Sequence, residues 1–511
     1  MDILPDSVIL DIFAFYLLDS ATDFPNKRGN NWHTLVHVCR RWRRIIFASP
    51  RQLHLYLHCY NETPVLKNLD FWPATLPLTL NYTLSGNHIF PRDENNIAAA
   101  LRHPSRVHRV STFGGALLIK KVATIMRKSF PALTHLNLVY DDFVSDDDSS
   151  TFPVIPRSLL GGSAPCLQHL HLKKVSFPRL PMFLLSARNL VTLQLEDTLQ
   201  KGYIFPEAMA GGLAVLTKLT TLSISSNEEI YGLNQQTRTD PSNRVILPAL
   251  FEFHYKGCSD YLEGFLAQVD TPRLNHLRIE YIAPHIRDPQ PYLQLSRFVD
   301  RTENLKLDKF TSAKVIFYHD DSYFEFGCLQ RKSSQTHLSL KLCDQDYLSL
   351  QVSYMAQVLG QLPGQLAVFP DVDDLSICGI GLMGLEDMNI TEWLPFFQLF
   401  PAVRALRLSG GVKTSIVSAF EETTQEAVTD HMFPALRSIW LVEDGDEVQD
   451  EGEAWGEDED EEDRNIPAGA IGHFLSLRQL AGRPVTVVTT EDEFVEANQE
   501  ANVEAQPAQD T

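Results

Sequence analysis

The segment LQHLHL, residues 167–172, places apolar residues at its first, fourth and sixth positions. Its last two leucines are separated by one polar residue, which is the period of a β-strand with one buried face. The same spacing returns at Leu133/Leu136/Leu138, Leu190/Leu193/Leu195, Leu219/Leu222/Ile224, Leu274/Leu277/Ile279, Val372/Leu375/Ile377, Val403/Leu406/Leu408 and Leu436/Ile439/Leu441. Weaker copies are Leu250/Phe253, Leu305/Leu307 and Leu338/Leu340. The pattern predicts a series of short strands that bury the same face.

The residues between these copies favour turns and helices. Many copies follow a proline, namely Pro131, Pro165, Pro248, Pro272, Pro370, Pro401 and Pro434, and proline is a common residue just before a strand. Helical spacing lies between copies, as at Leu262/Phe265/Leu266/Val269 and Trp393/Leu394/Phe397. Successive copies begin 23 to 37 residues apart. This alternation predicts an α/β fold, an irregular leucine-rich-repeat-like solenoid; an ordinary doubly wound domain with coincidental leucine runs is the alternative.

The residue between the last two apolar positions of each copy is expected to face outward from the sheet. These residues are Asn137, His171, Gln194, Ser223, Arg278, Lys306, Ser339, Ser376, Arg407 and Trp440. Strands stacked in this way form extended binding surfaces. We therefore take His171, Arg278, Lys306, Arg407 and Trp440 as candidate substrate-binding residues, with plain solvated surface as the alternative for each one.

The N-terminal segment carries a different pattern. Residues 4–18 predict a helix whose apolar residues cover nearly all of its faces: Val8, Ile9, Leu10, Ile12, Phe13, Phe15, Tyr16, Leu17 and Leu18. Such a helix must be buried, either against a partner protein or against its own chain. A second helix is predicted from Trp32, Leu35, Val38, Cys39, Trp42, Ile45 and Ile46, and Leu35, Val38 and Trp42 are expected to form mainly the module's own core.

Charge and cysteine usage narrow the class of protein. The chain of 511 residues has a formal net charge of -21, which is concentrated in an acidic tract at 443–463 and in the acidic tail 491–511, both predicted to be disordered. The remainder is close to neutral, so no nucleic acid is expected as a partner. The odd number of cysteines, 7, without any C-x-x-C motif, predicts reduced thiols in the cytoplasm or nucleus. No membrane span and no signal peptide are predicted.

The first 57 residues resemble an F-box of the fungal type. The resemblance rests on Leu4-Pro5, Val8-Ile9, Ile12-Phe13, the run LVHVCRRWRRIIFASPRQL at 35–53, and Trp32 before it. It implies that the chain holds the Skp adaptor of a Skp–cullin–F-box ubiquitin ligase and presents a protein substrate through the downstream domain. The implied adaptor-binding residues are Leu4, Pro5, Val8, Ile9, Ile12 and Phe13. An interaction scaffold outside a ligase is the alternative.

The resulting organisation is an F-box at 1–57, a connecting region and start of repeats at 58–105, a repeat domain at 106–490 with an acidic insertion at 443–465, and the tail. No enzyme activity, cofactor or metal site is predicted. The segment Gly379-Ile380-Gly381-Leu382-Met383-Gly384 matches G-x-G-x-x-G, but the next strand ends without the acidic residue of a dinucleotide site. His169 and His171 lie on one strand without a third metal ligand in view. A hydrolase or dehydrogenase would need a site assembled from distant residues.

Overall fold

The chain forms two compact units. The first comprises Met1–Ile230 with Asn243–Leu250, and the second comprises Tyr231–Ser242 with Phe251–Thr511. The structure is a computed structural model that describes residues 4–19, 32–50, 53, 56–59, 69–83, 91–141, 152–198, 204–226, 243–281, 293–306, 310–318, 323–330, 336–343, 348–361, 369–380, 388–421, 432–442 and 471–489. The predicted acidic insertion and the predicted acidic tail lie outside these residues.

The N-terminal module contains helices α1 (Asp6–Asp19), α2 (Trp32–Val36) and α3 (Arg40–Ala48). Its core joins the inner side of α1 to α2, α3 and the first repeats: Ile9, Phe13, Trp32, Leu35, Val36, Ile45, Ile46, Leu53 and Leu76 are buried together. Outside this core, Arg41 of α3 forms an ion pair with Asp6 at 2.7 Å, which ties the start of α1 to α3. Packing between α1, α2 and α3, together with this ion pair, therefore holds the module together.

The single helix predicted around residues 32–46 is wrong, because the segment divides into α2 and α3. Cys39 has an extended backbone, and its Sγ accepts a hydrogen bond from the amide of Trp42 at 3.4 Å. Cys39 thus caps a new helix instead of continuing the first one. As a result Val38 is 58% exposed, which corrects its expected place in the core.

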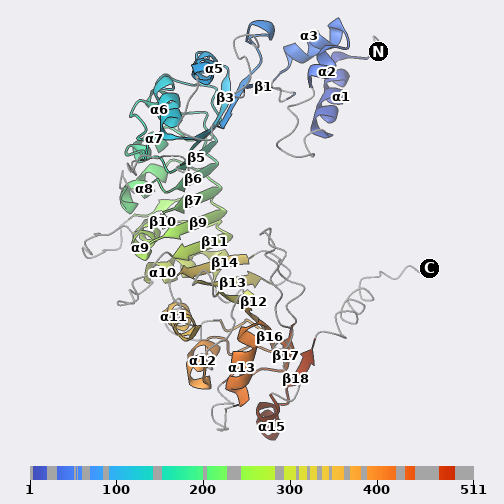
Figure 1. The fold of residues 1–511 in the computed structure, drawn as a ribbon, viewed down its shortest axis with the longest axis vertical. Helices are drawn as coiled ribbons and strands as arrows, with labels where there is room; N and C mark the ends of the chain where they lie inside the picture. Colours follow the sequence, from blue (N-terminus) through green and yellow to red (C-terminus); the bar gives the residue numbers. More distant parts are fainter. Residues whose placement is uncertain are drawn as a thin grey trace, which may run out of the picture. The chain divides into compact units, whose positions relative to one another are not determined.

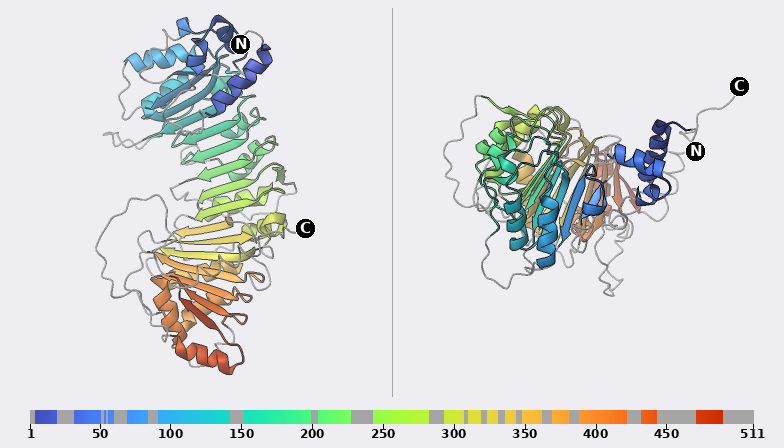
Figure 2. Two further views of the ribbon diagram at one scale, coloured as in Figure 1. Left: turned by 90° about the vertical axis from the view of Figure 1, so that its right-hand side faces the viewer. Right: turned by 90° about the horizontal axis from the view of Figure 1, so that it is seen from above.

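The first unit contains a parallel sheet whose strands follow one another in chain order, as Figures 1 and 2 show in blue to green. The strands are β1 (Leu57–Cys59), β2 (Leu78–Thr83), β3 (Val107–Gly114), β4 (His135–Tyr140), β5 (His169–Lys173), β6 (Thr192–Glu196) and β7 (Thr221–Ser225); β8 (Val245–Ile246) is separate from them. Helices α5 (Pro91–Leu101), α6 (Ala116–Ile125), α7 (Leu180–Leu184) and α8 (Pro206–Leu213), with the turn η1 (Leu159–Gly162), connect them. The helices lie on one side of the sheet (Figure 1) and leave its other face open.

Where a proline precedes a strand, it lies in a tight turn. The amide of Leu133 donates to the carbonyl of Phe130 at 3.1 Å, so Pro131 occupies the second position of a four-residue turn. Leu167 and Ala164 make the same bond at 3.2 Å around Pro165. Proline suits this position because its ring fixes φ near the required value. The same turn precedes β6 and β7 without proline, where Leu190 donates to Ala187 and Leu219 to Leu216, so proline favours this turn but is not required for it.

The second unit contains a sheet with strand order β9-β11-β14-β13-β12-β15-β16-β17-β18. The strands are β9 (Glu252–Gly257), β11 (His276–Tyr281), β12 (Phe310–Tyr318), β13 (Tyr323–Gln330), β14 (Thr336–Cys343), β15 (Asp374–Ile380), β16 (Ala405–Gly410), β17 (Ser438–Leu441) and β18 (Thr486–Thr489), with the short β10 (Val269–Asp270) outside this sheet. Its helices are α9 (Ser259–Gln268), α10 (Leu293–Arg301), α11 (Leu348–Gln361), α12 (Ile390–Phe397), α13 (Val412–Glu421) and α15 (Gly472–Leu480).

One part of this sheet departs from the expected pattern. Strand β13 is antiparallel to both β12 and β14, so a hairpin interrupts the parallel order. Leu305 does not begin a strand: it ends the short helical turn η2 (Glu303–Leu305), where its buried side chain packs inward. The prediction of a strand at Leu305 is therefore wrong, and Leu307 lies outside the described residues. The clear copies all coincide with strands of the two units. Within the described residues, no helix combines the length and the apolarity that crossing a bilayer requires.

Gly410 provides a test of the close strand packing in the second unit. Gly410 pairs with Gly379 across β15 and β16, has φ of 67°, and a Cβ built there would overlap the Gly379 carbonyl oxygen. We expect Gly410→Ala to lower the free energy of unfolding by about 2 kcal/mol or more in urea denaturation.

Gly360→Ala in α11 is the matched control, because the nearest atom outside its helix would lie 3.9 Å from the new Cβ. Alanine is the better helix former, so this variant should be neutral or more stable by up to about 1 kcal/mol. Equal stability of the two variants would contradict the close approach.

Candidate functional site

The outer side of α1, together with Leu4 just before the helix, exposes an unusual amount of apolar surface. The exposed fractions are 36% for Leu4, 39% for Val8, 48% for Ile12, 78% for Phe15 and 46% for Tyr16. Val8, Ile12 and Phe15 are spaced by four and three residues, so they lie along one side of the helix. A contiguous exposed apolar surface of this kind marks an interaction site in many proteins.

The structure divides the six predicted adaptor-binding residues into two groups. Leu4, Pro5, Val8 and Ile12 are exposed, whereas Ile9 and Phe13 are buried in the module. Phe13 packs edge-on against Trp42 of α3, with ring centroids 4.8 Å apart. Ile9 and Phe13 are one helical turn apart and face α2 and α3, so their assignment to a partner surface is corrected to internal packing.

The open face of the first unit's sheet is the second candidate surface. Leucine pairs such as Leu170 and Leu172 point toward the helices and are buried, while the residues between them face outward. The strand register aligns these outward residues into rows. One row is Thr79, Arg109, His135, His169, Thr192 and Thr221; the next is Asn81, Ser111, Asn137, His171, Gln194 and Ser223. The prediction that His171 lies on an outward strand position is confirmed.

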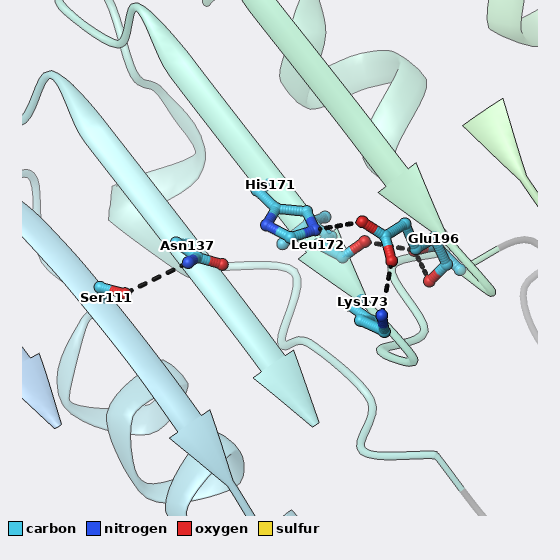
Figure 3. A network of polar contacts seen from close by, with 7 residues as sticks. Ser111, Asn137, His171, Leu172, Lys173 and Glu196 are labelled. Atoms are coloured by element: carbon cyan, nitrogen blue, oxygen red, sulfur yellow. Dashed lines mark hydrogen bonds and ion pairs between the residues drawn. The ribbon is translucent and has the colours of Figure 1, made fainter. Parts of the chain in front are cut away.

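A polar network occupies the middle of this face (Figure 3). The carboxylate of Glu196 binds Nε2 of His171 and Nζ of Lys173, each at 2.8 Å. The hydrogen bond from His171, followed by that from Lys173, lowers the pKa of Glu196 to about 2 from an ordinary value of 4.5. Figure 3 shows both side chains turned toward this one carboxylate, so Glu196 balances the charge of Lys173 within the network.

A second polar contact lies beside the network. Nδ2 of Asn137 donates to Oγ of Ser111 at 3.2 Å, joining β4 to β3. Oδ1 of Asn137 is buried, has no hydrogen-bond donor among the described residues, and points toward His171 in Figure 3. A buried acceptor without a donor carries a desolvation cost, so this oxygen makes no stabilising contribution to the face.

Basic and aromatic side chains gather where the strands begin. Arg109 lies with its guanidinium carbon 5.4 Å from the ring centroid of Tyr56. On the two following strands, the rings of His135 and His169 stack at 4.2 Å. Burial, together with the charge of Arg109, lowers the pKa of His135 to about 4 and also lowers the pKa of His169. Both imidazoles are therefore neutral near pH 7.

The remaining predicted site residues belong to the second unit. Arg407 and Trp440 are paired in register on β16 and β17, with the guanidinium 5.7 Å from the Trp440 ring centroid. Asp374 of β15 holds Arg407 through two hydrogen bonds of 3.1 and 3.0 Å. Arg278 is exposed on β11 and does not belong to that group. In the strand order of the sheet, β11 is separated from β15 by β14, β13 and β12. Lys306 follows η2 instead of lying on a strand, which corrects its predicted place in the row.

Several residues of these surfaces were not identified from the sequence. Glu196 ends β6 and His135 begins β4, both at outward positions, so the strand period could have identified them. His169, which begins β5, is considered from the sequence only as a possible metal ligand. Arg109 could not be placed this way, because β3 contains an irregularity: Leu78 pairs with Val107, but the next residue, Thr79, pairs with Arg109. The extra residue, His108, shifts the outward positions of this strand.

The described residues include no group of three or more His, Cys, Asp or Glu side chains that could hold a metal ion. A shallow hollow of about 610 Å³ lies where α3 meets the first repeats and is lined in part by Pro50, Pro77, Arg106 and His108. Arg106 is engaged there by the carbonyl oxygens of Leu76 and Pro73 at 3.0 and 3.2 Å. Arg106 therefore serves the packing between the module and the sheet.

Comparisons with known proteins identify no family for the chain. No protein-family model matches it, and no curated protein matches it. Among solved structures, the chain is similar to a leucine-rich-repeat protein of Leptospira interrogans with 14% identity and a TM-score of 0.23, over 84% of this chain and 92% of that one. The mixed α/β architecture stated above rests on the strand pairings themselves.

The ionised carboxylate of Glu196 is expected to stabilise the folded chain by an amount that depends on pH. Because the pKa of Glu196 is lower in the folded chain than its ordinary value of 4.5, ionisation favours folding. This contribution, about 1–2 kcal/mol for a partly exposed group, is complete above pH 4.5 and is lost as the pH falls toward 2. Glu196→Gln should therefore destabilise the chain at pH 7, and by less at pH 3.

Urea denaturation of the wild type and Glu196→Gln at pH 7, 5 and 3 measures this difference. Glu207→Gln, at an exposed position of α8, is the matched control and should leave stability within about 0.5 kcal/mol of the wild type. A difference between wild type and Glu196→Gln that stays constant down to pH 3 would refute the contribution of the ionised carboxylate.

Proposed function

We propose that this chain is the substrate-recognition subunit of a Skp–cullin–F-box ubiquitin ligase and acts in the cytoplasm or nucleus. The observation that carries the proposal is the exposed apolar surface formed by Val8, Ile12, Phe15 and Tyr16 of α1 together with Leu4, which precedes the helix. The same segment carries the sequence resemblance to an F-box. A surface of large apolar side chains is costly to leave in water, and a partner protein would remove that cost.

Docking would use α1 in two ways. Ile9 and Phe13 would hold the helix on the module, while Val8 and Ile12 would enter the adaptor. Each side chain of this size contributes roughly 1.5–3 kcal/mol when it becomes fully buried, so a few of them suffice for a stable interface. The internal core would remain unchanged on binding, because it is already complete.

Recognition of a substrate is assigned to the open faces of the sheets. Outward residues of neighbouring strands lie about 4.8 Å apart, which places hydrogen-bonding groups at regular intervals along an extended surface. The chain itself would supply no catalytic group to ubiquitin transfer. Its contribution would be proximity, since holding adaptor and substrate together raises the local concentration of the substrate lysine near the conjugating enzyme.

Ile12→Asp in the full chain tests the docking surface. Because Ile12 is exposed, we expect the variant to keep the wild-type unfolding midpoint while losing at least tenfold in affinity for the Skp adaptor, measured by calorimetry or co-purification. The loss follows from placing a charge in an apolar interface.

Met182→Asp is the matched control, because Met182 is an exposed apolar residue on α7, away from α1. It should bind the adaptor as the wild type does. Wild-type chain that does not bind the adaptor would refute the ligase role, and adaptor binding without cullin recruitment would favour a scaffold instead.

A further inference from the structure

The row of outward residues at the start of the strands in the first unit has an uncompensated positive charge. Arg109 on β3 is exposed and has no hydrogen-bond or ion-pair partner among the described residues; its contact is with the ring of Tyr56. By contrast, His171 and Lys173 are already paired with Glu196. Arg109 is thus available to an anion from outside the chain, whereas the basic residues of the network are not.

The neighbouring positions add hydrogen-bond donors and no competing acid. From β2 to β7, the two outward rows that contain Arg109 and Asn137 include no Asp or Glu. They consist of Arg, His, Thr, Ser, Asn and Gln side chains, most of which can donate a hydrogen bond. The register places Arg109 beside His135 and His135 beside His169, so three donors follow one another across three adjacent strands.

The protonation state of His135 and His169 determines how much negative charge on a ligand this row can balance. His135 is held by Thr134, whose Oγ1 lies 2.8 Å from Nδ1, and stacks on His169. His135 is surrounded by Arg109 and His108 from β3 and by His169 from β5, all of which oppose its protonation. With both imidazoles neutral near pH 7, the row carries one formal charge, which a single carboxylate balances and a phosphate dianion exceeds.

We propose that Arg109, His135 and His169 bind an Asp or Glu side chain of an acidic partner segment that lies across β3, β4 and β5. The acidic segment would be the ligand of the open face, and its assignment rests on the proposed role of that face in substrate recognition. The carboxylate pairs with Arg109 and accepts from an imidazole N–H. Bound next to His135, it raises the pKa of that imidazole, so binding takes up protons and becomes tighter as the pH falls from 7 toward 5.

The test uses the full chain with histidine side chains labelled with 13C, assigned through His135→Gln and His169→Gln. The probes are end-blocked hexapeptides of alternating Thr and Glu, the same peptide with Gln in place of Glu, and the same peptide with phosphoserine in place of Glu. We expect the Glu peptide alone to shift the His135 and His169 resonances strongly, to raise their pKa, and to bind several-fold tighter at pH 5.5 than at pH 7. The Gln peptide should bind at least tenfold more weakly.

Arg109→Gln should weaken binding of the Glu peptide at least tenfold, whereas Arg109→Lys should retain part of the affinity. Arg278→Gln is the matched control, because it removes an exposed strand arginine from the other unit, and it should change affinity less than twofold. Equal binding of Glu and Gln peptides, tighter binding of the phosphoserine peptide, or an unchanged affinity in Arg109→Gln would overturn the proposal. These outcomes are separate from adaptor binding, which Arg109→Gln should preserve and Ile12→Asp should weaken at least tenfold.

Discussion

The pairing of parallel strands that each bury two apolar side chains is the constraint on which the rest of the structure depends. A strand such as β5 satisfies its backbone hydrogen bonds through β4 and β6 and places Leu170 and Leu172 under the helices. Because side chains alternate along a strand, burying these leucines forces His169, His171 and Lys173 outward. The outward polar surface is thus a direct consequence of core packing, repeated strand after strand.

The same constraint explains why charge is distributed unevenly over the open face. The residue at an outward position can differ from strand to strand without disturbing the hydrophobic core. Side chains of neighbouring strands can therefore form distinct polar groups. Glu196 joins His171 and Lys173 into a closed network, and Asp374 does the same for Arg407 beside Trp440. Arg109 has no such acidic neighbour in its row. Compensated groups stabilise the sheet, whereas an uncompensated cation is suited to binding a ligand.

In the N-terminal module, helix α1 has two apolar sides, of which one is buried in the module and the other is exposed. Ile9 and Phe13 complete an internal core with Trp32 and Ile46, and that core already fixes the helix in place. Val8, Ile12 and Phe15 are consequently not needed for the module's own folding. A short helix can carry both functions because residues three and four apart share a side, so two apolar stripes fit on one helix.

The amino-acid sequence predicts the strands that carry a leucine pair, the Pro-x-Leu turns before many of them and the outward position of His171, because strand period and proline geometry are local properties. It does not predict which apolar residues of α1 are buried in the module and which remain exposed, since a helix that is apolar on all sides gives no sign of which side packs against its own chain. Nor did it reveal the antiparallel hairpin of β12 and β13, the division into α2 and α3 at Cys39, or the irregularity at His108. The row of Arg109, His135 and His169 joins residues about 26 and 34 positions apart in sequence. Only the register between strands decided that contact, because register is a property of neighbouring strands and not of any one segment.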